Sequence, residues 1–311
     1  MNGPERLTLA GHQGISLVAN RAGPQNGPPV LLLHGGGQTR HAWEKTARRL
    51  ADAGYRTIYP DQRGHGDSAW HEEGDYAFID YAADLAALLR AIIDEGGRRP
   101  VVVGASLGGF AAILSEGDLA PGLMRALVLV DITPRVSLDG VAKVHGFMRA
   151  RASEGFVSLA DAADAVARYL PHRQRPPTVE GLRKNLRQRA DGRFYWHWDP
   201  KFIDGPRPAG HEREKATVQI AAAAARLSCP VLLVRGARSE LIEDVHVREY
   251  QDLVPHGTVI DVRDAGHMVA GDRNDVFGDA VIAYLGGLED GIPAAPGAVN
   301  GKSGLPSAGP R

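Results

Sequence analysis

The sequence predicts an α/β fold built on a mostly parallel sheet. Six short runs rich in Val, Leu and Ile recur along the chain, and helical patterns separate them. Uninterrupted apolar runs of this length are typical of strands that are buried on both faces, as in a parallel sheet. Alternation of strand and helix then requires right-handed crossovers. The six runs are residues 29–33, 55–59, 100–103, 126–130, 230–234 and 258–262.

Two further strands and several helices complete this expectation. Residues 7–9 and 15–18 have the pattern of an antiparallel hairpin, which raises the sheet to about eight strands. Residues 79–93 repeat apolar side chains at helical spacing and stop at Gly96-Gly97, a helix-ending signal. Residues 110–114 continue from the third run as a helix of small and apolar residues.

The alternation breaks between residues 133 and 227, where prolines separate four helical stretches. These stretches are residues 141–150, 158–169, 179–190 and 213–226. We interpret the region as a helical cap inserted after the sixth strand; the alternative is a helical half of the core itself. The domains would be a core of residues 1–134 and 228–288, a cap of 135–227 and a flexible tail of 289–311, which is rich in Gly, Pro, Ala and Ser.

Composition narrows the function classes. Lys plus Arg number 36 against 37 Asp plus Glu, without the basic excess expected of a nucleic-acid-binding protein. Cys229 is the only cysteine, which excludes an intramolecular disulfide and argues against a cysteine-based zinc site. No apolar run approaches the roughly 20 residues that span a bilayer, and residues 1–10 lack a signal-peptide core. We expect a cytoplasmic protein without a nucleic-acid or membrane partner; a homodimer stays open.

The strongest local signal is a Gly-x-Ser-x-Gly sequence, Gly104-Ala105-Ser106-Leu107-Gly108. It lies directly after a predicted strand and before a predicted helix. A nucleophile on such a tight strand-to-helix turn is exposed, and small neighbours keep the adjacent chains from colliding. The turn also directs backbone N–H groups at a reacting carbonyl. Ser106 is therefore our candidate nucleophile; the alternative is an ordinary serine in a glycine-rich turn.

Two other motifs follow strands. His34-Gly35-Gly36-Gly37 lets the backbone approach the Ser106 turn and offers an N–H group to an oxyanion, with His34 as a hydrogen-bonding scaffold residue. No phosphate-binding fingerprint accompanies these glycines. His267 follows the last strand, and a serine nucleophile needs a base with a pKa near 7. The order of nucleophile first and histidine last is the order of a known triad arrangement.

Together these motifs resemble the α/β-hydrolase superfamily over residues 5 to 287, in its serine esterase, thioesterase and lactonase members with a helical cap. The segment Asp61-Gln62-Arg63-Gly64-His65-Gly66-Asp67-Ser68 also matches and would be a structural turn. The resemblance implies Ser106 as nucleophile, His267 as base, and the N–H groups of Gly36 and Leu107 as the oxyanion hole. Haloalkane dehalogenases and epoxide hydrolases of this fold carry Asp at the nucleophile position, so the chain does not resemble them.

The triad acid stays open between two carboxylates. The usual position in the superfamily follows the strand at 231–234, where Glu240 lies. Asp131 directly follows the strand at 126–130, a position that some esterases and thioesterases of this fold use. We favour Asp131 because a short side chain at a strand end is held in a well-defined place.

These residues predict hydrolysis of a small to medium apolar or aromatic ester, thioester or lactone, without a metal or an organic cofactor. The aromatic stretch 194–198 suggests a lid over the substrate, although packing explains it equally well. Alternatives are carbon–carbon hydrolysis of ring-cleavage products, perhydrolase-like chemistry, or a non-catalytic receptor for a small ligand. The candidate substrate-contacting residues are Gly37, Phe147, Met148, Tyr195, Trp196, Trp198 and Met268.

Overall fold

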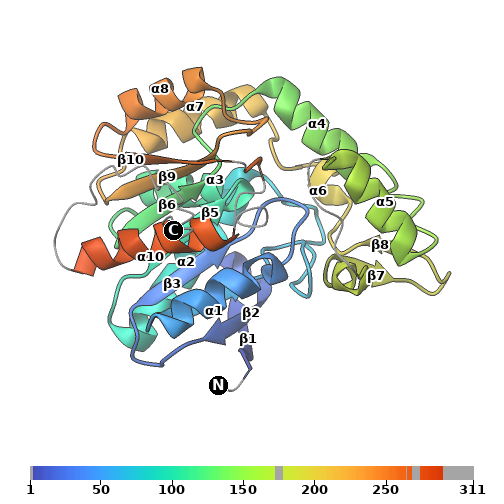
Figure 1. Ribbon diagram of the computed structural model, residues 1–311, viewed down its shortest axis with the longest axis horizontal. Helices are drawn as coiled ribbons and strands as arrows, with labels where there is room; N and C mark the ends of the chain where they lie inside the picture. The colour runs from blue at the N-terminus through green and yellow to red at the C-terminus, as the bar shows by residue number, and fades with distance from the viewer. Residues whose placement is uncertain (1–2, 172–177, 264, 268–273, 290–311) are drawn as a thin grey trace, which may run out of the picture.

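The sheet of the computed structural model has eight strands, as the sequence predicts (Figure 1). The structure describes residues 3–171, 178–263, 265–267 and 274–289. The strand order is β1-β2-β4-β3-β5-β6-β9-β10; β2 is antiparallel to β1 and β4, and all later pairs are parallel. The strands are β1 (Glu5–Ala10), β2 (Ser16–Ala22), β3 (Pro29–Leu33), β4 (Arg56–Pro60), β5 (Val101–Ala105), β6 (Ala126–Val130), β9 (Val231–Gly236) and β10 (Thr258–Val262).

Helices cover both faces of the sheet. Alternate residues of β3 belong to different clusters: Leu31 and Leu33 face one apolar layer, and Val30 and Leu32 face the other. The second layer holds α1 (Glu44–Asp52) and α10 (Asn274–Glu289), and the first holds the other core helices. These are α2 (Phe78–Gly96), α3 (Leu107–Leu114), α7 (Arg213–Ala224) and α8 (Asp244–Leu253); short helical turns are η1 (His12–Gly14), η2 (Arg40–Trp43) and η3 (Ser115–Leu119). Burial on both faces explains the uninterrupted apolar runs.

Helix α2 follows directly from its sequence. Its apolar positions Leu85, Leu88, Leu89 and Ile92 recur every three or four residues, and all four are buried. The helix ends at Gly96, and the next residue, Gly97, has a φ of 67°, the left-handed conformation that glycine adopts without strain.

A separate lobe lies between β6 and β9, at the right of Figure 1. The helices predicted over 141–150 and 158–169 are present as Leu138–Arg149 and Leu159–Tyr169, but the helix expected over 179–190 is wrong. That segment is a 3₁₀ turn followed by a strand, because the chain reverses at Gly192 and residues 186–188 pair with residues 194–196. The lobe contains α4 (Leu138–Arg149), α5 (Leu159–Tyr169), η4 (Glu180–Asn185), β7 (Leu186–Gln188), β8 (Phe194–Trp196) and α6 (Lys201–Asp204).

The last helix of the inserted region packs against the core. Helix α7, which the sequence predicts as part of the cap, packs against α3 of the core.

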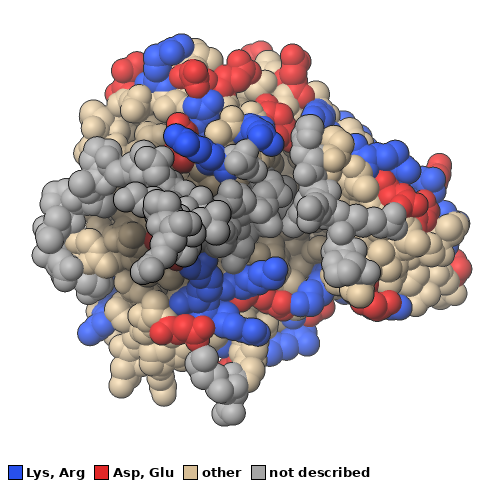
Figure 2. Space-filling model, viewed as in Figure 1, with Lys and Arg blue, Asp and Glu red and all other residues tan. Residues whose placement is uncertain are grey.

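The predicted tail lies outside the described residues from 290 onward. Charges of both signs are interspersed over the face in Figure 2. Among the described helices, none has the length and apolar character needed to cross a membrane.

Candidate active site

Ser106 occupies a strained turn between β5 and α3. Its φ of 45° and ψ of −108° lie outside the regions that L-residues normally adopt. Glycine is required on both sides: a Cβ atom on Gly104 would lie 2.6 Å from the Gly108 carbonyl oxygen, and one on Gly108 would lie 2.5 Å from Leu33 Cβ. The packing of the turn therefore explains the glycine spacing of the motif.

The Gly36 loop lies beside this turn. A Cβ atom on Gly35 would come within 3.4 Å of Ser106 Cβ. Leu107 is the first residue of α3, and neither its N–H nor that of Gly36 donates a hydrogen bond within the described part of the chain. His34 Nε2 accepts the N–H of Gln62 at 3.0 Å, so its Nδ1–H donates to the Gly35 carbonyl at 2.8 Å. Because a trans peptide points its N–H opposite to its C=O, this bond fixes the direction of the Gly36 N–H.

His65 holds the next peptide of the same loop. Its Nε2 accepts the Gly37 N–H at 3.1 Å and its Nδ1–H donates to the Arg63 carbonyl at 2.9 Å. Phe202 of α6 packs edge-on against the ring, with centroids 4.7 Å apart. Burial, the largest cause, lowers the pKa of His34 to about 4 and that of His65 to about 3. Both imidazoles are therefore uncharged parts of the scaffold.

These two histidines make the folded chain sensitive to acid. Their ordinary pKa of 6.5 falls on folding, so the unfolded chain binds more protons below that pH. The free energy of unfolding should be constant above about pH 6.5 and decrease as the pH falls toward 4. Each histidine should contribute a slope of up to about 1.4 kcal/mol per pH unit. Urea unfolding at pH 7, 6 and 5 measures this, and equal midpoints at all three values would contradict it.

Asp131 contacts His267. Asp131 follows β6 with a φ of 48°, and its fully buried carboxylate lies 2.9 Å from His267 Nδ1 through Oδ2. Its Oδ1 accepts the Gly236 N–H at 2.8 Å. Glu240, the other candidate acid, accepts a hydrogen bond from Tyr169 of α5, and burial with this contact raises the pKa of Tyr169 to about 12. The structure brings Asp131 to the imidazole and directs Glu240 to the cap.

Ser239 also contacts the Asp131 carboxylate, and the sequence reasoning missed it. Its hydroxyl donates to Asp131 Oδ2, the same oxygen that contacts His267, and its Oγ accepts the N–H groups of Leu241 and Ile242. A hydroxyl side chain shortly after β9, near the usual position of the triad acid, is the signal that could have identified it.

We expect Ser239→Ala to lower kcat by about tenfold while leaving KM nearly unchanged, because the loss of one charge-assisted hydrogen bond costs about 1.5 kcal/mol. Steady-state kinetics on an aryl ester measure this. Ser239→Thr keeps the hydroxyl and is the matched control. Equal kcat values in the alanine and wild-type proteins would contradict the role of Ser239 in holding Asp131.

Ser106 and His267 line one cavity of about 830 Å³ between the core and the inserted lobe. No hydrogen bond joins Ser106 Oγ to His267 Nε2 in the described residues. Such bonds are commonly long before substrate binds. The structure thus places a serine hydroxyl, an imidazole in contact with a buried carboxylate, and the Gly36 and Leu107 backbone at one cavity.

The cavity walls include most of the predicted substrate contacts. Gly37, Phe147, Met148, Trp196 and Trp198 line it. Tyr195 does not, which corrects the prediction: successive residues of β8 face opposite sides, and the Tyr195 hydroxyl donates to Asp191. Met268 lies outside the described residues. In the part of the chain that is described, no group of three or more His, Cys, Asp or Glu side chains is placed to hold a metal ion.

The cap is fixed to the core through the turn at residues 61–68. The Gly66 N–H donates to the His197 carbonyl at 2.7 Å, and the Asp199 N–H donates to the Gly64 carbonyl at 2.7 Å. The Tyr76 hydroxyl donates to Asp199 Oδ2 at 2.6 Å. The segment whose His65 side chain accepts the Gly37 N–H therefore also holds the inserted lobe against the core.

Comparison with known proteins identifies the family of this chain. The family model described as alpha/beta hydrolase fold matches residues 28–273. The chain is 32% identical over 258 residues to esterase Rv0045c of Mycobacterium tuberculosis, covering 79% of this chain and 78% of that protein. It is 30% identical over 251 residues to 2-(acetamidomethylene)succinate hydrolase of Mesorhizobium japonicum, and this match covers 78% of this chain and 83% of that protein.

Solved structures give the same result. A crystal structure of the Mycobacterium tuberculosis esterase Rv0045c superposes with a TM-score of 0.70 at 28% identity, over 92% of this chain and 94% of that one. The crystal structure of E-2-(acetamidomethylene)succinate hydrolase superposes with a TM-score of 0.77 at 23% identity, over 91% of this chain and 100% of that one. This likeness supports the fold alone. The chain is a hydrolase of the esterase type, and it belongs to the α/β-hydrolase family.

Proposed function

We propose that this protein is a serine hydrolase that cleaves a small to medium apolar or aromatic ester, thioester or lactone through an acyl-enzyme on Ser106. The observation that carries the proposal is the contact between buried Asp131 and His267, at a cavity that Ser106 also lines. The strained turn at Ser106 supports it, since backbone strain is concentrated at functional sites.

The chemistry follows from these positions. His267 Nε2 accepts the hydroxyl proton of Ser106 as Oγ attacks the carbonyl carbon. The Gly36 and Leu107 N–H groups stabilise the oxyanion, and each donor is worth about 3 kcal/mol by analogy with other enzymes. His267 then gives the proton to the leaving alcohol, thiol or ring oxygen. Water repeats the sequence on the acyl-enzyme, releases the acid and restores Ser106.

The cavity supports an apolar or aromatic substrate. Phe147 stacks on Tyr169 with centroids 4.1 Å apart and meets Trp196 edge-on at 5.6 Å. These rings form a large apolar wall in the lobe that covers Ser106. The wall favours apolar groups by burying their surface.

A substrate panel tests the reaction class. Aryl and alkyl esters, thioesters and lactones of graded size are assayed beside a dienone ring-cleavage product. We expect ester-type turnover without cleavage of the carbon–carbon bond. Cleavage of the dienone with negligible turnover of every ester, thioester and lactone would replace this proposal by a carbon–carbon hydrolase.

A further inference from the structure

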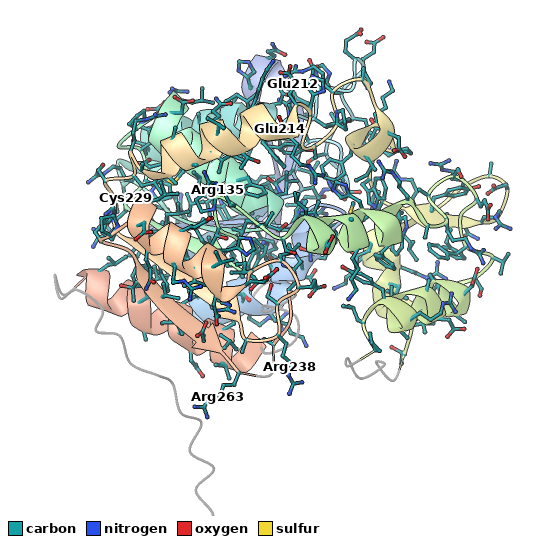
Figure 3. The ribbon with its side chains drawn as sticks, turned by 90° about the horizontal axis from the view of Figure 1, so that it is seen from above. Arg135, Glu212, Glu214, Cys229, Arg238 and Arg263 are labelled. Carbon is teal, nitrogen blue, oxygen red and sulfur yellow. The ribbon has the colours of Figure 1, made fainter. Side chains whose placement is uncertain are left out.

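Two helices line the cavity with both apolar and polar side chains. Helix α4 contributes Leu138, Val141, His145 and Met148, which share one face at helical spacing. Helix α7 contributes Arg213, Thr217 and Ile220 at spacings of four and three. Figure 3 shows both helices, with Glu212 and Glu214 labelled at the beginning of α7. The polar groups at this wall are His145 and Arg213, together with the Thr217 hydroxyl, which already donates to the Arg213 carbonyl.

His145 lacks a protein partner. Its imidazole makes no hydrogen bond within the described residues. Burial is the largest cause that lowers its pKa, and the positive charges of Arg213 and Arg149 lower it further, whereas Asp204 acts in the opposite direction. His145 and Arg213 line the same cavity. The imidazole is therefore an uncharged ring with an N–H group available to a ligand.

Arg213 also lacks a partner. It forms no ion pair with any acid in the described part of the chain. The neighbouring carboxylate, Glu212, accepts a hydrogen bond from Lys215 and not from Arg213. As the first residue of α7, Arg213 lies where the helix dipole disfavours a cation, so the helix itself does not explain a positive charge there.

The acids that line the cavity pair with other cations. Glu44 accepts a hydrogen bond from Lys184 and contacts His41, and Glu249 pairs with Arg135 at 3.5 Å through Oε1, whereas its buried Oε2 has no hydrogen-bond partner. Within the described ranges, neither acid forms an ion pair with Arg213. This part of the cavity therefore has a positive potential that a negatively charged ligand group would balance.

We propose that Arg213 and His145 bind a carboxylate at the remote end of the substrate, so that the preferred substrate is an ester with an apolar spacer and a free carboxylate. The inference rests on the proposed serine hydrolase function. A guanidinium donates two parallel hydrogen bonds to a carboxylate, and the neutral imidazole N–H adds a third donor. Apolar residues that line the same cavity, such as Met148 and Ile220, accommodate the spacer.

The test compares matched esters with and without the carboxylate. One set consists of 1-naphthyl half-esters of adipic, pimelic and suberic acids against 1-naphthyl alkanoates of the same chain length. A second set carries the carboxylate on the alcohol side: acetates of 6-hydroxyhexanoic and 8-hydroxyoctanoic acids against hexyl and octyl acetates. In at least one set we expect kcat/KM about tenfold higher for the charged ester, the usual gain from a charge-assisted pair.

Three variants locate the effect. Arg213→Gln should remove the preference for the charged ester. Lys215→Gln is the matched control, because Lys215 lies on the same helix, is exposed and does not line the cavity. Lys45→Gln tests the other cation on the cavity wall that forms no ion pair among the described residues.

Two results would overturn the carboxylate site: no charged ester is preferred in either set, or Arg213→Gln keeps the preference. If only Lys45→Gln lost the preference, the substrate carboxylate would bind at α1, and the site at Arg213 and His145 would be refuted. Failure of the wild-type protein to hydrolyse any neutral or charged ester refutes the proposed function instead, so the two failures are distinguishable.

Discussion

Replacement of Ser106 by alanine is expected to lower kcat by about 10⁴- to 10⁶-fold, because no other group can form the acyl-enzyme. Folding should be unaffected, since alanine has nearly the same volume and adopts the same strained φ of 45°. Steady-state kinetics with an aryl ester measure the loss, and far-ultraviolet circular dichroism checks the fold.

Ser106→Gly provides a matched control for this first variant. Glycine adopts a positive φ without strain, so the glycine variant should be as inactive as the alanine variant but more stable, by about 0.5–1 kcal/mol. The stability of both is measured by urea unfolding. Residual activity within tenfold of the wild-type value in either variant would exclude Ser106 as the nucleophile.

The second large effect is expected for Asp131→Asn, which should lower kcat by about 10⁴-fold. The asparagine side chain still reaches the Gly236 N–H and His267, but its amide does not stabilise an imidazolium, and its NH₂ group selects the wrong imidazole tautomer. KM should change much less than kcat. The measurement is the kcat of the purified variant over the neutral to alkaline range.

Glu240→Gln is the control for the acid, because the sequence leaves both carboxylates open. Glu240 contacts Tyr169 and not His267, so its amide should keep kcat within about threefold of the wild-type value, in the range of weak surface contacts. The opposite ranking, with Glu240→Gln inactive and Asp131→Asn active, would contradict the placement of the acid after β6.

Much of the core could be predicted because its signals are local. Strands β3, β5, β6 and β9 are buried on both faces, and strands of this kind consist of consecutive apolar residues, here mostly Val and Leu. The sequence pattern therefore predicts them directly. The nucleophile turn is also local, since the steric need for Gly104 and Gly108 arises within a few residues of Ser106.

The choice of Asp131 as the acid, and its contact with Ser239, could not be predicted from local sequence signals. Asp131 and Ser239 lie 108 positions apart in sequence, and their contact depends on the adjacent ends of β6 and β9. Asp131 also has a positive φ, which Asp adopts more often than most residues but which the sequence does not fix.

The cap was the least predictable part. Strands β7 and β8 have three residues each, too short for an alternating pattern to appear. Their pairing depends on the turn at Gly192 and on aromatic packing, such as that of Trp196 on Phe156, whose ring centroids are 5.0 Å apart. The side of β8 that Tyr195 faces follows from this register, which the sequence did not reveal.

Covalent labelling with a fluorophosphonate, followed by peptide mass mapping, tests the central claim most directly. The account predicts one adduct, on Ser106, which forms quickly in the wild-type protein, far more slowly in Asp131→Asn, and not at all in Ser106→Ala. The absence of any adduct on Ser106 in the folded wild-type protein would contradict the account and favour a receptor that binds its ligand without chemistry.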